Sequence, residues 1–209
     1  AIWILHQIGT RPARNAILKA LSDPNEIVRL AAINSIGLAK DPKAPLDQLH
    51  NILMGDQPAL RRAVASTLGL LGGTKSNGAL IVAANTATNR FEEHAIIYSL
   101  IENYSQMTNS KIKISALQLR SLPAGSARAA LTAFDQMDNS QLEKQHVLPL
   151  LEYPDPAVQA TAAKVIATHP EWVDAAIIHL QQKFFAYSLE KEELAGMKEI
   201  MRAFAANPK

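Results

Sequence analysis

Residues 23–39 read DPNEIVRLAAINSIGLA, and this stretch returns twice further along the chain. A shift of 32 residues places VRLAAINSIG (28–37) on LRRAVASTLG (60–69), and a second shift of 32 places it on EEHAIIYSLI (92–101). Self-similarity at a fixed period of this size is the signature of a repeat protein in which each unit packs on its neighbours. The repeat therefore decides the fold class.

The composition agrees with an all-helical chain. Of the 209 residues 48% are hydrophobic and only 5% aromatic, and small aliphatic side chains let helices pack closely. The formal net charge of +2 is too small to indicate a nucleic-acid-binding protein by itself. The absence of cysteine excludes disulfides and zinc–thiolate sites. No apolar run reaches the ~20 residues that a membrane span requires.

Proline and glycine divide the chain into short helices separated by tight turns. These helices are predicted to form antiparallel pairs that begin 30 to 34 residues apart, at about 12–39, 44–71, 76–103, 110–137, 140–168 and 171–206. Residues 1–9 read like the end of a preceding pair, so we expect an excised segment of something longer. The prediction is one domain over 1–209, a right-handed all-α solenoid truncated in mid-repeat at its N-terminus.

The second helix of each pair carries small or apolar residues at the spacing of one helix face. In the first two pairs this stripe comprises Val28, Ala31, Ala32, Ser35, Ile36 and Ala39, and then Leu60, Ala63, Val64, Thr67, Leu68 and Leu71. We expect the stripe to face the core, with Gly37 and Gly69 allowing the paired helices to approach closely. A single pair cannot bury such a stripe, so stability must come from stacking.

The motif D-P-x-x-x-V-R-x-x-A at residues 23–32 resembles the second-helix signature of HEAT repeats, particularly the short bacterial type. The resemblance implies a pair between Asp23 and Arg29 that ties neighbouring repeats together. Glu93 stands at the arginine position in the third repeat and Gln159 in the fifth. The resemblance therefore predicts a ladder of such pairs that is interrupted in those two repeats.

Residues 93–101 and 129–137 are also similar to the HEAT segments of large multidomain bacterial proteins. In those proteins the repeats lie between a β-propeller dehydrogenase-like module and a c-type cytochrome module. This narrower resemblance implies the periplasm or cell envelope, and without it the cytoplasm is expected. Neither module is visible here, since the chain has no C-x-x-C-H haem motif and no propeller strands.

No arrangement of reactive residues stands out. The cluster Glu92-Glu93-His94 is interpreted as a solvated helix start whose carboxylates favour the positive end of the helix, with metal or acid–base use as the alternative. Residues 69–76 resemble a phosphate loop, but Thr74 replaces the required glycine and a helix precedes it, so a glycine helix stop is the better interpretation. We therefore predict a protein that is not an enzyme and has no cofactor, metal site or catalytic residue.

In HEAT-like stacks the second helices line the concave face, so the resemblance predicts a binding surface there. The residues out of register with the core stripe form two columns, Leu30, Arg62, His94, Arg128 and Ala160, and Asn34, Ser66, Tyr98, Thr132 and Lys164. The candidate binding residues from these columns are Arg62, Ser66, His94, Tyr98, Arg128, Thr132 and Lys164. An ordinary solvated face is the alternative.

The predicted function is a non-enzymatic protein-interaction scaffold or inter-module spacer, excised from a larger bacterial protein. Its partner would be another protein or a neighbouring domain of the same polypeptide. The alternative is nucleic-acid binding or base excision, because some HEAT-like solenoids are DNA glycosylases. Phosphates would then be held by Arg61, Arg62, Lys111, Lys113, Arg128 and Lys164. Interleaved acidic residues and the small net charge disfavour this alternative.

Overall fold

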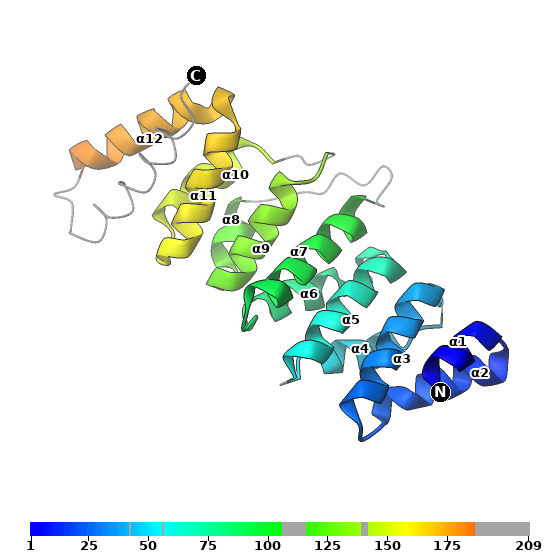
Figure 1. The fold of residues 1–209 in the computed structure, drawn as a ribbon. Helices are drawn as coiled ribbons and strands as arrows, with labels where there is room; N and C mark the ends of the chain where they lie inside the picture. The colour runs from blue at the N-terminus through cyan, green and yellow to red at the C-terminus, as the bar shows by residue number, and fades with distance from the viewer. Residues whose placement is uncertain (42, 56, 106–115, 139–141, 187–209) are drawn as a thin grey trace. The chain divides into compact units, whose positions relative to one another are not determined.

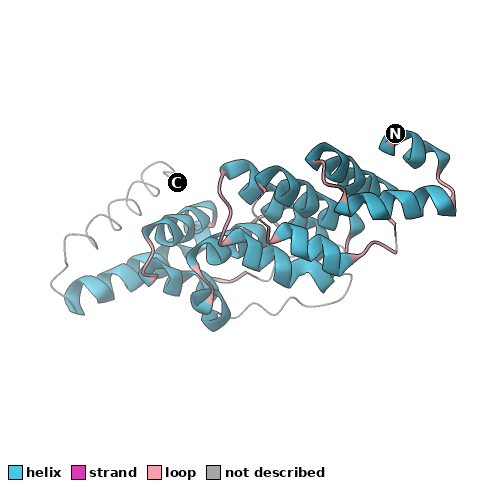
Figure 2. Cartoon of the chain, turned by 90° about the horizontal axis from the view of Figure 1, so that it is seen from below, coloured by secondary structure: helices cyan, strands magenta, loops and turns pink. Residues whose placement is uncertain are grey.

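The structure, a computed structural model, describes residues 1–41, 43–55, 57–105, 116–138 and 142–186. Within these ranges the regular elements are helices, with no strand (Figures 1 and 2). The chain forms two compact units, residues 1–110 and 111–209. The predicted all-α solenoid is confirmed: within each unit, successive helix pairs pack on their neighbours.

The first unit has its second helices side by side in one layer, each covered by a first helix (Figure 1). In this layer α3 packs on α5 and α5 packs on α7, while α2, α4 and α6 pack on α3, α5 and α7. The elements are α1 (Ile2–Ile8), α2 (Arg11–Lys19), η1 (Ala20–Ser22), α3 (Glu26–Ala39), α4 (Leu46–Leu53), α5 (Pro58–Leu71), η2 (Thr74–Ser76), α6 (Asn77–Ala84) and α7 (Arg90–Ser105).

The second unit repeats this arrangement, with α9 packed on α11 and shorter helices against both. Its elements are α8 (Ala116–Ser121), α9 (Ala124–Asp135), α10 (Lys144–Val147), η3 (Leu148–Glu152), α11 (Pro156–Thr168), η4 (Pro170–Trp172) and α12 (Val173–Ala186). The predicted pair starts near 110 and 140, and the predicted helix over 189–206, lie outside the described residues.

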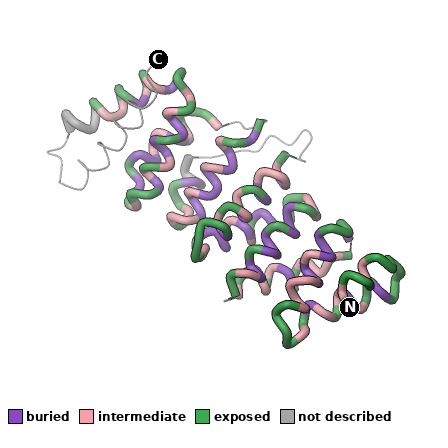
Figure 3. Tube along the Cα trace, in the orientation of Figure 1, coloured by how far each residue is buried: buried purple, intermediate pink, exposed green. Residues whose placement is uncertain are grey.

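The core stripe predicted for α5 lies inside the stack (Figure 3). Its members are buried except for Leu71, which is half-buried at the end of the helix. On α3 the centre of the stripe is buried as well, but Ala39 is exposed because the chain turns away at Lys40, whose φ of 45° is left-handed. The predicted core face is therefore correct along the helices and wrong at the last turn of α3.

Burial on α5 extends well beyond one stripe. Arg61, Ala65 and Gly69 are buried too, although they lie outside the apolar stripe. The reason is that α5 has α3 on one side, α7 on the other and α4 over its core face. A helix inside a solenoid thus hides three of its sides, and only a narrow strip containing Arg62, Ser66 and Leu70 stays exposed.

Gly37 and Gly69 allow close approach, but between successive second helices and not within a pair. A Cβ atom added at Gly69 would lie 3.0 Å from the Cα of Ser99 on α7. A Cβ atom added at Gly37 would lie 2.9 Å from the Oγ1 of Thr67 on α5. The prediction that these glycines bring the two helices of one pair together is therefore wrong. They allow the second helices of neighbouring repeats to approach each other.

Hydroxyl groups join the same helices where the glycines bring them together. The Thr67 hydroxyl donates to the Ile33 carbonyl at 3.1 Å, and the Ser99 hydroxyl donates to the Ala65 carbonyl at 2.7 Å. Each donor lies 34 residues after its acceptor, so the two bonds are the same contact in successive repeats. Both side chains are buried, and burying a hydroxyl without a partner is unfavourable. These bonds therefore fix the spacing of α3, α5 and α7.

Replacing Gly69 by alanine should destabilise the protein by about 1–3 kcal/mol, because the new methyl group overlaps the backbone of α7. Gly78 provides the control. It is an exposed helical glycine whose added Cβ meets nothing within 4 Å, so Gly78→Ala should stabilise by about 0.5–1 kcal/mol through helix propensity. Urea unfolding of both variants checks this pair. Two changes of the same sign would contradict the proposed close approach.

Candidate functional site

The exposed strip of α5 contains two of the predicted binding residues. Arg62 and Ser66 are both exposed and lie four residues apart, so they share one face of the helix. Leu70 continues this face with 43% of its surface exposed. The prediction omitted Leu70, although its spacing from Ser66 was visible in the sequence.

The neighbouring helix α7 presents the other two candidates of the first unit. The rings of His94 and Tyr98 lie nearly parallel, 6° apart, with centroids separated by 6.5 Å. Both side chains are exposed, Tyr98 by 57%. The pKa of Tyr98 is raised, first by a hydrogen bond with Glu102 and then by the charge of that carboxylate. The phenol therefore stays neutral at physiological pH.

The packing of α7 on α5 brings these side chains onto adjacent helices of one layer. We call the set Arg62, Ser66, Leu70, His94 and Tyr98 the second-helix face. In the equivalent positions of the second unit, Arg128 and Thr132 on α9 are half-buried and Lys164 on α11 is exposed. These three residues form a separate group in the second unit.

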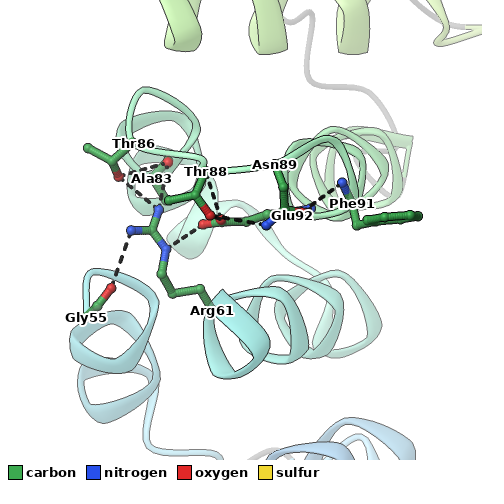
Figure 4. Close-up of polar contacts among 8 residues, drawn as sticks. All are labelled: Gly55, Arg61, Ala83, Thr86, Thr88, Asn89, Phe91 and Glu92. Atoms are coloured by element: carbon green, nitrogen blue, oxygen red, sulfur yellow. Dashed lines mark hydrogen bonds and ion pairs between the residues drawn. The ribbon is translucent and has the colours of Figure 1, made fainter. Parts of the chain in front are cut away.

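Arg61, a phosphate-binding candidate of the nucleic-acid alternative, lies inside the first unit and not on its surface (Figure 4). Its Nε lies 2.5 Å from the Glu92 Oε1, and the two side chains are 7% and 0% exposed. The guanidinium also donates to the Gly55 carbonyl at 3.3 Å, the Ala83 carbonyl at 3.2 Å and the Thr86 hydroxyl at 2.9 Å. Arg61 is thus unable to contact a phosphate; Lys111 and Lys113 lie outside the described residues.

Glu92 is also not the solvated carboxylate that the sequence suggested. Its Oε2 accepts hydrogen bonds from the Thr88 amide at 3.0 Å and the Thr88 hydroxyl at 3.1 Å. Asn89 occupies the start of the helix, where its Oδ1 accepts from the Phe91 and Glu92 amides at 3.1 Å. The interpretation was wrong for Glu92 because this side chain points toward α5, where Arg61 supplies the opposite charge.

The predicted pair between Asp23 and Arg29 is wrong in its chemistry. The guanidinium of Arg29 donates to the backbone carbonyl of Asp23 at 2.7 Å, while the Asp23 carboxylate accepts the Asn25 amide at 2.8 Å. The link to the next repeat is a 2.6 Å hydrogen bond from Arg29 to the Gln57 side chain. Neighbouring repeats are therefore joined here through a neutral acceptor.

The fifth repeat retains part of this contact despite lacking the arginine. Gln159 donates from Nε2 to the Tyr153 carbonyl at 2.8 Å, six residues earlier in the chain. Arg29 reaches the Asp23 carbonyl over the same separation. The predicted interruption at Gln159 is thus wrong for the bond within the repeat, since an amide donor replaces the guanidinium.

A polar cluster around His169 joins α9 to the end of α11. The ring Nε2 lies 3.0 Å from the Asp135 carboxylate, and Nδ1 lies 3.1 Å from the Glu171 carboxylate. The ring also stacks on Trp172, with centroids 3.9 Å apart. The pKa of Glu171 is lowered, chiefly by a hydrogen bond from its own backbone amide and further by His169. We regard this cluster as structural because Trp172 is buried beneath it.

Among the described residues, no group of three histidine or acidic side chains is placed to hold a metal ion. No described helix is long and apolar enough to cross a bilayer. The arrangement on the second-helix face is one of contact groups: a guanidinium, a hydroxyl, an apolar side chain and two stacked rings.

Comparison with known proteins gives a match in the first unit. A family model described as HEAT repeats matches residues 14–101. No curated protein and no solved structure matches the chain. HEAT repeats generally mediate protein interactions as scaffolds, and the family is typically non-enzymatic. The stacked helix pairs of residues 14–101 are therefore similar to HEAT repeats.

Proposed function

We propose that the protein is a non-enzymatic interaction scaffold that binds a protein partner on its second-helix face. The observation that carries this proposal is the exposed grouping of Arg62 with the stacked His94–Tyr98 pair and Leu70 on adjacent helices. Arginine and tyrosine are enriched among the residues that dominate protein interfaces. Residues 93–101 and 129–137 resemble the HEAT segments of large multidomain bacterial proteins. In such a protein the partner is a neighbouring domain of the same polypeptide, and the repeats also act as a spacer between domains.

The interior of the first unit supports this role because it holds the contact residues in place. Ser99, one residue after Tyr98, is bound to the Ala65 carbonyl, and Ala65 precedes Ser66. The backbone positions that carry the face are thus linked directly across α5 and α7. A preorganised surface loses less conformational entropy when a partner binds.

The double variant Arg62→Ala/Tyr98→Ala should lose partner binding while its stability stays within about 0.5 kcal/mol of the parent, because both side chains are exposed. The measurement compares the proteins retained from a cell extract by immobilised parent and variant chains, with thermal unfolding of each recorded by circular dichroism. A control variant, Asn51→Ala/Val82→Ala, changes exposed residues on the first helices α4 and α6. Identical retention by all three chains would refute the proposed face.

Nucleic-acid binding is the weaker candidate. Arg61 is buried, so it cannot be one of the phosphate-binding residues of this alternative. Arg62 and Lys164 are exposed, but they belong to different units. Phosphate-driven binding weakens steeply with salt, so a gel shift at low salt is the most permissive test. The scaffold proposal predicts no retardation of a duplex or a single-stranded oligonucleotide.

A further inference from the structure

A cleft lies at the edge of the first unit, where α2 meets the connection between α3 and α4. Its larger part has a volume of about 270 Å³ and is lined by Arg11, Arg14, Asn15, Leu18, Asp41 and Lys43. A smaller part of about 100 Å³ is lined by His6, Gly9, Arg14, Ile17, Leu18, Ser35, Ile36, Ala39 and Asp41. The two parts are neighbours, since Arg14, Leu18 and Asp41 line both.

The larger part of the cleft is cationic. Arg11, Arg14 and Lys43 are exposed, and their side chains form no ion pair or hydrogen bond with the residues that the structure describes. Asp41 is the single acidic residue in the lining, and it is 9% exposed with one oxygen accepting the Lys43 amide at 2.9 Å. Three cations against one carboxylate leave an excess of positive charge directed at the solvent.

The cations continue the repeat along this edge. Lys43 follows Arg11 by 32 residues, and Lys75, also exposed, follows Lys43 by 32. Packed helices lie about 8–10 Å apart, so equivalent residues of successive repeats have a similar spacing. An extended peptide advances about 3.3–3.6 Å per residue, so its side chains three residues apart match that spacing.

We infer that this cleft binds an extended acidic peptide segment of a partner protein. Carboxylates of the segment pair with Arg11, Arg14 and Lys43, and one small aliphatic side chain enters the smaller part against Ile17 and Ile36. This surface is formed by α2, residues of α1 and α3 and the connection to α4, and it shares no residue with the second-helix face. The inference therefore stands or falls independently of the function proposed above.

The lining favours a peptide over a nucleic acid. Neither part of the cleft is lined by Phe, Tyr or Trp, the side chains on which unpaired bases stack. Asp41, which lines both parts, repels phosphates and carboxylates alike, but it is able to accept a hydrogen bond from a backbone amide, a donor that a peptide repeats along its length. The smaller part offers Ile17 and Ile36 to an aliphatic side chain, while His6 and Ser35 in the same lining are hydrogen-bonded to each other at 2.9 Å.

The test uses a fluorescein-labelled peptide with one valine followed by three glutamates that are spaced three residues apart. It is titrated with the full chain and followed by fluorescence anisotropy. We expect saturable binding that weakens as salt is added. Arg14→Glu should weaken binding by about tenfold or more, because it reverses a charge in the cleft. Lys19→Glu is the control, since it makes the same charge change at an exposed position of α2 outside the cleft. Its effect should stay within about twofold.

The apolar contact in the smaller part of the cleft is tested by changing the peptide. Replacing the valine by serine should weaken binding by about fivefold, because the apolar contact is lost. Lys43→Glu provides a second charge reversal in case Arg14→Glu loses its helical circular dichroism spectrum. The inference is overturned if the acidic peptide shows no saturable binding, or if Lys19→Glu weakens binding as much as Arg14→Glu. Displacement of the peptide by an equal concentration of inorganic phosphate or of an oligonucleotide would also overturn it, since the site would then be a general anion surface.

Discussion

Replacing Glu92 by alanine is expected to destabilise the protein by about 3–5 kcal/mol, because it leaves the charge of Arg61 buried without its counter-ion. Arg61 would keep only the neutral oxygens of Gly55, Ala83 and Thr86 as acceptors. The Thr88 amide and hydroxyl would lose their shared acceptor at the same time. Urea unfolding followed by far-ultraviolet circular dichroism measures the loss.

Two further variants separate this effect from helix electrostatics. Glu26 is an exposed acidic residue in the first turn of α3, so Glu26→Ala should cost less than about 1 kcal/mol. Replacing the whole pair, as Arg61→Met/Glu92→Leu, should restore most of the stability lost by Glu92→Ala, because no unpaired charge remains buried. A Glu92→Ala protein as stable as Glu26→Ala would show that the buried pair does not form.

Replacing Leu68 by alanine is expected to destabilise the protein by about 2–5 kcal/mol through loss of apolar contacts and formation of a cavity. Leu68 is a residue of α5, and its side chain is 1% exposed because neighbouring helices cover it. The same change at Ile36, which is 2% exposed, should have an effect of similar size one repeat earlier. Both values come from the denaturant midpoints of the variants.

Leu70 is the matched control for Leu68, since the two leucines lie two residues apart on α5. Its side chain is 43% exposed, so Leu70→Ala should cost less than about 1 kcal/mol. The difference between the two variants tests the assignment of the buried and exposed sides of α5. Equal losses of stability would place both leucines in the same environment, contrary to the fold described above.

The fold class and the buried stripe were predictable from the sequence because every interior repeat buries the same face against the same kind of neighbour. Val64 and Leu68 recur at the position of Ala32 and Ile36 since each second helix must bury the same face. The exposed positions of Arg62, Ser66, His94 and Tyr98 follow from the same periodicity. A repeated local pattern is sufficient when each element contacts only its neighbours.

The ion pair between Arg61 and Glu92 was not predictable in this way. The two residues are 31 positions apart. Arg61 stands at the repeat position of Arg29, but nothing in the sequence indicates Glu92 as its partner, since Glu92 looks like an ordinary charge in the first turn of its helix. They meet because α7 packs on the side of α5 that lies outside its apolar stripe. Helical periodicity describes one buried face, whereas a helix inside a stack is covered on three sides.

The sequence by itself determined that helices form pairs that repeat about every 32 residues. It also determined which stripe of each second helix faces the core. Only the tertiary structure decided which charges are buried, what Gly69 touches, and that a cationic cleft opens beside Asp41. The physical reason is that apolar periodicity is a property of one helix, while the partners of a charge, a hydroxyl or a missing Cβ belong to the next helix in the stack.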